Sequence, residues 1–108
     1  MQCLWGGLRI NHHGLIVVNA KAKIGEWCDI HQGVNIGQNI ENDSVPIIGD
    51  NVWIGPGAKI FGKIEIGDNV MIGANAVVNK SFSNGNCRLG GNPAVIISDL
   101  PNVYHRTM

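Results

Sequence analysis

A six-residue period runs through most of the sequence and limits the folds that the chain can adopt. Val or Ile occupies ten of the eleven positions spaced six apart from 18 to 78, and only Asn42 interrupts this row. Val and Ile make up about a quarter of the chain, so the row is not a chance arrangement. Neither the 3.6-residue period of a helix nor the two-residue alternation of a hairpin strand produces this spacing.

A period of eighteen residues contains the shorter one. The segment Gly49 to Ile60 repeats as Gly67 to Val78, and Asp50 falls on Asp68 eighteen residues later. The pattern is typical of hexapeptide repeats, in which each hexad supplies a short strand and a turn and three hexads complete a triangular coil. Gly, Asn and Asp gather between the aliphatic positions because such turns need left-handed backbone angles. The sequence therefore predicts an all-β solenoid, a parallel β-helix.

A second row, four residues after the first, holds small or aliphatic residues and is also expected to point inward. Cys28 belongs to this row and is predicted to be a buried thiol. Trp53, Met71 and Val77 are apolar but lie outside both rows, so they suit a contact between copies of the chain. Small domains and short solenoids often need partners, so we expect self-association. The second row comprises Ala22, Cys28, Val34, Ile40, Val52, Ala58, Ile64, Val70 and Ala76.

The whole chain, residues 1–108, is predicted to form one domain. Residues 37–47 are polar, contain Pro46 and include the failed hexad at Asn42, so we expect a loop that bulges from one corner. Residues 81–108 leave the repeat and are predicted to form a C-terminal cap, in which Val95 to Ile97 folds back as a short strand.

Composition excludes several classes of function. The formal net charge is zero, which argues against nucleic acid or an anionic membrane surface as a partner. We find no apolar run long enough to span a membrane, and the first residues do not resemble a signal peptide. The three cysteines are odd in number and unpatterned, which favours a reducing cytoplasm.

Histidine is scarce, and two of the four histidines are adjacent. His31 lies eighteen residues after His13, so the two side chains could stack on neighbouring coils and hold a metal ion. Metal enzymes that resemble the γ-class carbonic anhydrases use three histidines, and no third histidine is in phase here. We therefore expect no metal site and interpret His31 as an outward polar side chain at a turn.

From Leu8 to Ile97 the chain resembles the hexapeptide acyltransferases, in particular the serine acetyltransferase branch. The segment LRINHHGLIVVNAKAKIG resembles the place where that branch carries its catalytic histidine. IGPGAKI, IGANAVVNKS and GGNPAVII resemble the coenzyme-A-binding coils and the closing G-N-P-A motif. The resemblance implies a left-handed β-helix, a homotrimer with sites between subunits, and transfer of an acetyl group from acetyl-CoA to a hydroxyl group.

The same resemblance assigns roles to particular residues. His12 takes the position of the catalytic histidine, and its near-neutral pKa range suits a general base. His13 is the alternative base, and a structural capping role for His12 stays open. The pantetheine arm is expected near Pro56 and Ala74. The far part of the coenzyme is expected at Asn79 and Lys80, with Lys80 and Arg88 as phosphate partners or as plain surface charges.

Departures from the serine acetyltransferases bear on the acceptor. Their aspartate that orients the histidine has no counterpart in this sequence, where Asn11 is the nearest polar residue. Their second histidine stands before a proline, and here that place is Val45 before Pro46. The short loop and the N-H-H-G segment look more like the saccharide O-acetyltransferases. We therefore expect a sugar or another small hydroxyl compound as acceptor, with serine, or a trimmed non-catalytic module, as alternatives.

Overall fold

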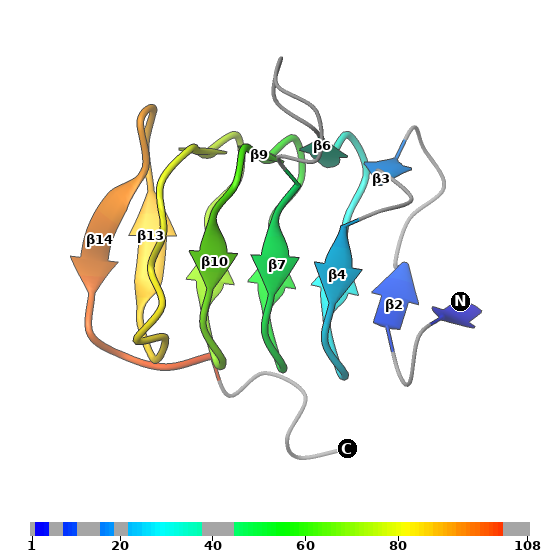
Figure 1. Cartoon of the computed structure of the whole chain (residues 1–108), viewed down its shortest axis with the longest axis horizontal. Helices are drawn as coiled ribbons and strands as arrows, with labels where there is room; N and C mark the ends of the chain where they lie inside the picture. The colour runs from blue at the N-terminus through cyan, green and yellow to red at the C-terminus, as the bar shows by residue number, and fades with distance from the viewer. Residues whose placement is uncertain (1, 5–7, 11–15, 19–21, 38–44, 103–108) are drawn as a thin grey trace.

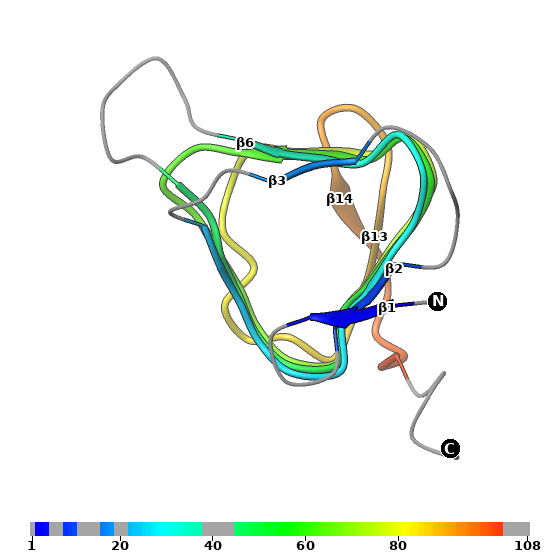
Figure 2. The ribbon, with the colours of Figure 1, turned by 90° about the vertical axis from the view of Figure 1, so that its right-hand side faces the viewer.

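The computed structural model describes residues 2–4, 8–10, 16–18, 22–37 and 45–102. Within these residues the regular elements are short β-strands that wind around a prism of triangular cross-section (Figure 1; Figure 2). The chain adds one strand to each side of the prism in turn, so strands that are neighbours in a sheet come from successive coils. The predicted parallel β-helix is confirmed.

Each side of the prism is one sheet, and most neighbouring strands in it are parallel. The side that we name sheet A contains, in spatial order, β1 (Gln2–Leu4), β2 (Leu8–Ile10), β5 (Asp29–Ile30), β8 (Trp53–Ile54), β11 (Met71–Ile72), β13 (Arg88–Gly90) and β14 (Val95–Ser98). Sheet B contains β12 (Val77–Val78), β9 (Lys59–Phe61), β6 (Asn35–Gly37) and β3 (Val17–Val18). Sheet C contains β10 (Glu65–Ile66), β7 (Ile47–Ile48) and β4 (Lys23–Ile24).

The core consists of the two rows that the six-residue period predicts. Ile30, Ile54 and Ile72 stack along sheet A and are completely buried. Cys28 is also completely buried, which confirms its prediction as a core thiol. Burying one such aliphatic side chain contributes roughly 1.5–3 kcal/mol, so repeating it in every coil stabilises a small prism. The other buried aliphatic residues of the two rows are Val34, Ile36, Ile48, Val52, Ala58, Ile60, Ile64, Ile66, Val70, Ala76 and Val78.

The strand register explains the failed hexad at Asn42. Ile47 pairs with Glu65 eighteen residues later, but Lys23 pairs with Ile47 twenty-four residues later. The coil that contains Asn42 is therefore longer by one hexad. Because β6 ends in sheet B and β7 begins in sheet C, the extra hexad falls at the corner between these two sheets. Residues 38–44 of the predicted loop lie outside the described residues.

The stack continues further than the repeat pattern indicates. Met71 pairs in parallel with Arg88, seventeen residues later, and Leu89 extends the buried row of Ile72. The period misses this rung because its coil has seventeen residues instead of eighteen. The strand β14 then runs antiparallel to β13, which confirms the predicted fold-back of Val95 to Ile97. The described part of the chain contains no helix that could cross a membrane.

Candidate active site

The turns that join sheet A to sheet B form the corner that we name the A–B corner. Its described turns are residues 31–34, 55–58 and 73–76, each one coil above the last. The strand β2 ends in sheet A and β3 begins in sheet B, so the segment with His12 and His13 connects the same two sheets. These two histidines lie outside the described residues.

The register shifts by two residues beside these histidines. Arg9 pairs with Asp29 twenty residues later, whereas Val17 pairs with Asn35 eighteen residues later. The connection between β2 and β3 is therefore two residues longer than a standard hexad. A strict six-residue count back from Val18 would put position 12 in the inward row, but the strand register pairs Ile10, not residue 12, with Ile30. His12 itself lies outside the described residues, so its role as the base stays a prediction.

Pro56 and Ala74 stand on two successive turns of the A–B corner, one coil apart. The backbone N–H of Asn75 donates a hydrogen bond to the backbone carbonyl oxygen of Pro56 at 2.9 Å, and this bond stacks the second turn on the first. The turns need left-handed backbone angles, and Gly57 and Asn75 supply them with φ of 76° and 59°. A side chain at Gly57 would meet the Asn75 side-chain oxygen. The corner is thus a tightly packed backbone ridge, with Ala74 exposed and Pro56 half-buried.

His31 stands at the first of these turns, and its ring is buried instead of exposed at 8% relative accessibility. Its Nδ1 lies 2.7 Å from the Ile54 carbonyl oxygen, which can only accept a hydrogen bond. Nδ1 therefore donates, which makes Nε2 the basic nitrogen of the neutral ring. The ring also packs on Trp53 with centroids 4.8 Å apart. The interpretation of His31 as an outward polar residue missed this fixed orientation.

Lys59 is a second residue of this corner that the sequence interpretation did not single out. Its ammonium group donates to the carbonyl oxygens of Gly33 at 3.1 Å and Gly57 at 2.8 Å. The side chain thus ties two successive turns together. The sequence could have indicated this role, because Lys59 directly follows the buried Ala58 and therefore points outward. From that position a lysine can reach back to the carbonyl oxygens of its own turn.

The other three predicted coenzyme residues lie elsewhere on the prism. Asn79 and Lys80 follow β12 and are exposed at the corner between sheets B and C. Arg88 belongs to β13 in sheet A, is half-buried, and has an Nε that is buried without a hydrogen-bond partner. One prism therefore brings Pro56 and Ala74 together but does not bring all five residues to one place.

The thiols and the carboxylates of the described residues suggest no other chemistry. Burial raises the pKa of Cys28 to about 12 and also raises the pKa of Cys87, so neither thiol suits nucleophilic catalysis. Both are free cysteines. Within the described ranges no three His, Cys, Asp or Glu side chains gather as a metal site would require. His13, the proposed metal partner of His31, lies outside these ranges.

Comparison with known proteins identifies the repeat. Residues 46–80 match the model of the bacterial transferase hexapeptide family, described as six repeats. The repeat of these residues is that of the hexapeptide transferases, and the chain is similar to the serine acetyltransferase branch. Its fold is the left-handed β-helix of that branch.

Relatives and solved structures agree with this assignment. The chain is 43% identical over 97 residues to a serine acetyltransferase of Staphylococcus xylosus, covering 88% of this chain and 37% of the relative. It is 37% identical over 93 residues to that of Synechococcus elongatus, covering 84% and 38%. The Brucella abortus serine acetyltransferase in complex with coenzyme A superimposes with a TM-score of 0.86 at 35% identity, covering 94% of this chain and 41% of that one. The hexapeptide-repeat chain thus spans about two fifths of the length of these proteins.

Proposed function

We propose that this hexapeptide-repeat chain is an acetyl-CoA-dependent O-acetyltransferase that acts on a hydroxyl group of a small molecule. The observation that carries the proposal is the A–B corner, where the stacked turns of Pro56 and Ala74 lie at the corner that also connects β2 to β3. The similarity to a serine acetyltransferase that binds coenzyme A supports acetyl-CoA as the donor.

The reaction needs a base, an oriented thioester and a donor for the oxyanion. The base removes the hydroxyl proton while the hydroxyl oxygen attacks the thioester carbonyl carbon. The tetrahedral intermediate then collapses, the carbon–sulfur bond breaks, and the thiolate of coenzyme A takes the proton. His12 is the proposed base and His13 the alternative. Holding the thioester against the ridge supplies orientation, and a backbone N–H would stabilise the oxyanion.

The acceptor is proposed to be a sugar or another small hydroxyl compound. Val45 is half-buried and Pro46 is buried, so position 45 offers no ionisable group where serine acetyltransferases carry their second histidine. Serine is the second candidate, because the relatives are named serine acetyltransferases. Within the proposal Pro56 and Ala74 line the pantetheine arm, and Asn79, Lys80 and Arg88 meet its far end.

The first test is calorimetric titration of the purified chain with acetyl-CoA, followed by measurement of released coenzyme A thiol. Binding of about one donor per subunit, with thiol release on adding a sugar, is the expected result. Release on adding serine but no sugar would favour serine acetylation. Absence of binding at millimolar coenzyme would overturn the proposal and leave a non-catalytic β-helix module.

A further inference from the structure

The strand β14 is the last strand of sheet A, and one of its edges is unpaired. Sheet A runs from β1 to β14, and among the described strands β14 pairs with β13 alone. Figure 1 shows β14 beyond the other strands at this end of the prism, so its free edge faces away from the coils. The unpaired N–H and C=O groups of an edge strand form a template to which another strand can add.

The side chains of β14 are apolar although they lie at the surface. Val95, Ile96 and Ile97 are exposed at 49%, 51% and 66%. Successive side chains of a strand point to opposite faces, so Val95 and Ile97 share one face and Ile96 lies on the other. The side chain of Ile97 lies against Gly90 of β13 but stays largely uncovered. A solenoid normally ends in a cap with a polar outer surface, and the end formed by β14 is apolar on both faces.

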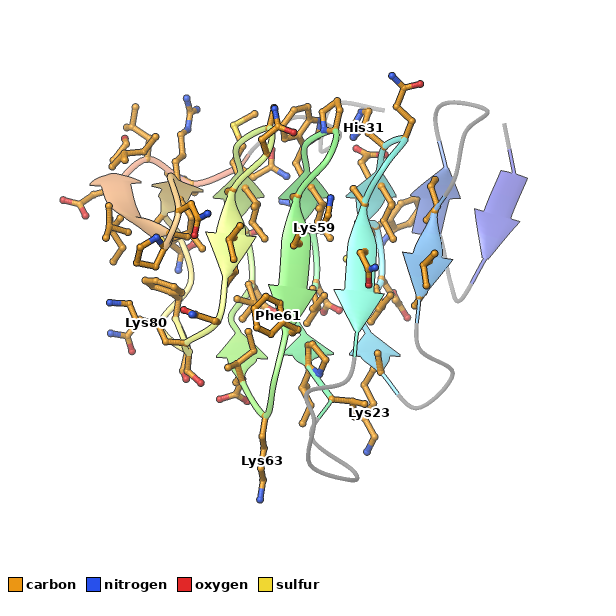
Figure 3. The ribbon with its side chains drawn as sticks, turned by 90° about the horizontal axis from the view of Figure 1, so that it is seen from above. Lys23, His31, Lys59, Phe61, Lys63 and Lys80 are labelled. Carbon is orange, nitrogen blue, oxygen red and sulfur yellow. The ribbon has the colours of Figure 1, made fainter. Side chains whose placement is uncertain are left out.

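Charge does not protect this edge from other strands. Edge strands are commonly kept apart by charged side chains, especially lysine, or by proline. Residues 95–98 read VIIS and contain neither a charge nor a proline. Figure 3 shows Lys23, Lys59 and Lys63 on coils that lie well away from β14 along the prism. The carboxylate of Asp99 comes only after the end of the strand.

A second copy of β14 fits this edge when the two strands run antiparallel about a twofold axis at Ile96. Each Ile96 then lies beside its counterpart, and Val95 of one copy lies beside Ile97 of the other. Opposed β-branched side chains stabilise an antiparallel pair. The two carboxylates stay apart, because the same register puts each Asp99 opposite Pro93 of the other copy. The apolar run is therefore complementary to itself.

We propose that the free edge of β14 is a contact between two copies of this chain, which join end to end and continue sheet A from one copy into the other. A twofold contact closes after two copies, whereas pairing of β14 with β1 of a second copy would continue as an open fibre. The contact lies at the end of the prism, so it leaves the sides of the prism free for other association. It does not depend on the proposed acetyl transfer.

The contact is expected to be weak. The strand has four residues, and Ile97 has no register partner in β13, so β14 bulges there. Such a short pair buries much less than the about 1,200 Å² at which stable interfaces begin. We therefore expect a dissociation constant of about 0.1–1 mM, at the weak end of the affinity scale.

Sedimentation velocity from about 10 µM to about 2 mM spans this dissociation constant. The wild type should change from its smallest assembly to twice that mass as concentration rises. Ile96→Lys should keep the smallest mass throughout, because the twofold axis brings two ammonium groups together. Ile47→Lys is the matched control and should double like the wild type, since Ile47 is exposed at 46% but lies in β7 of sheet C.

Mixing two charged variants tests the twofold axis itself. Ile96→Lys and Ile96→Glu should each fail to double alone, whereas their equal mixture should double again because an ammonium group then meets a carboxylate. Ile96→Thr is a milder variant that keeps a β-branched side chain and should raise the dissociation constant about threefold to tenfold. Far-UV circular dichroism that matches the wild type shows that each variant keeps its fold.

Four results would overturn the proposal. The first is a wild type that keeps one mass over the whole range, and the second is doubling that Ile96→Lys retains. The third is a mass that grows beyond twice the smallest assembly, which would indicate head-to-tail pairing with β1. The fourth is a mixture of the two charged variants that does not double, which would show that β14 meets a different surface of the second copy.

Discussion

Asparagine side chains form a ladder at the corner between sheets C and A. Asn51, Asn69 and Asn86 come from successive coils and all adopt left-handed angles, with φ of 58°, 59° and 51°. The Asn51 side-chain amide donates to Asn69 at 2.8 Å, and Asn69 donates to Asn86 at 3.0 Å. In the preceding coil the same turn position holds Trp27, which has φ of 62°. The ladder therefore begins with a residue that is strained in this conformation.

We predict that Trp27→Asn raises the free energy of unfolding by about 1–2 kcal/mol. Asparagine tolerates the left-handed angle, and its amide can donate to the side-chain oxygen of Asn51, which is buried without a partner. Trp27→Ala is the control, since it removes the indole but provides neither benefit. Urea unfolding measures the difference. Equal stability of the two variants would contradict the explanation.

We predict that His12→Ala lowers turnover about a hundredfold or more, because general base catalysis contributes at least that factor. Release of coenzyme A thiol under saturating acetyl-CoA is the measurement. His13→Ala is the matched control and should retain most of the activity. If the loss follows His13 instead, the alternative base is correct; unchanged turnover in both variants would end the histidine mechanism.

The buried thiol of Cys28 makes stability depend on alkaline pH. Burial raises its pKa from 9.0 to about 12. Between these values the folded chain keeps a proton that the unfolded chain has lost, so stability falls as pH rises. The thiol also donates to the Gly49 carbonyl at 3.3 Å.

Between pH 8 and pH 10 the titration of Cys28 lowers the free energy of unfolding of the wild type by about 1.4 kcal/mol. We predict that Cys28→Val, which has no thiol, does not show this part of the alkaline loss. Valine suits the site because Val52 and Val70 occupy the same buried row. Urea unfolding at the two pH values gives the difference between variant and wild type. The same alkaline loss in both chains would show that the thiol is not its cause.

At the scale of the turn, the glycine after the inward isoleucine leaves room for a side chain from the next coil. The Asp68 carboxylate accepts a hydrogen bond from the backbone N–H of Asp50 at 2.7 Å, and its oxygen lies where a side chain at Gly49 would be. The same glycine position in another turn is less crowded. A side chain at Gly73 would meet its nearest atom, the Leu89 carbonyl oxygen, at 3.3 Å.

We predict that Gly49→Ala destabilises the fold by about 2–3 kcal/mol, because overpacking has that cost and the Asp68 hydrogen bond is disturbed. Gly73→Ala is the matched control and should cost less than about 1 kcal/mol, since a small shift relieves the contact. Thermal unfolding of the two variants compares them. A loss at Gly73 as large as at Gly49 would contradict this account of the repeat.

For the whole molecule, apolar surface remains outside the core. Val95, Ile96 and Ile97 are about half-exposed or more, at 49%, 51% and 66%, and lie in β14 at the end of sheet A. Trp53, Met71 and Val77 are half-buried on the outer faces. Pro56 and Ala74 are separated from Lys80 and Arg88 on one prism, so a site that uses all of them needs more than one copy.

We predict a homotrimer in solution. Light scattering at micromolar concentration should give three times the mass of the chain, and the mass should persist over a tenfold dilution. Exposed apolar surface and the resemblance to the serine acetyltransferases motivate this expectation. A monomer would contradict both the trimer and an active site shared between subunits.

The placement of site residues was less predictable than the core. Pro56 and Ala74 lie one coil apart in a regular region, so the eighteen-residue period alone puts them on the same corner, while their contact with the coenzyme stays a prediction. Arg88 was not placed in sheet A, because its coil has seventeen residues and the six-residue count no longer applies there. His31 and Lys59 were not recognised as parts of the ridge, because their bonds go to backbone carbonyls that carry no signal in the sequence.

The sequence by itself determined the solenoid, its three-sided coil and its buried rows, because inward and outward positions in a hexad follow from local spacing alone. It also indicated the family through ordered motifs. The tertiary structure decided which turns share a corner, since that depends on the length of every coil, including one longer by a hexad and one shorter by a residue. It also decided that Lys59 bonds to the carbonyl oxygens of two successive turns, because residues far apart in the sequence meet only when the coils are stacked.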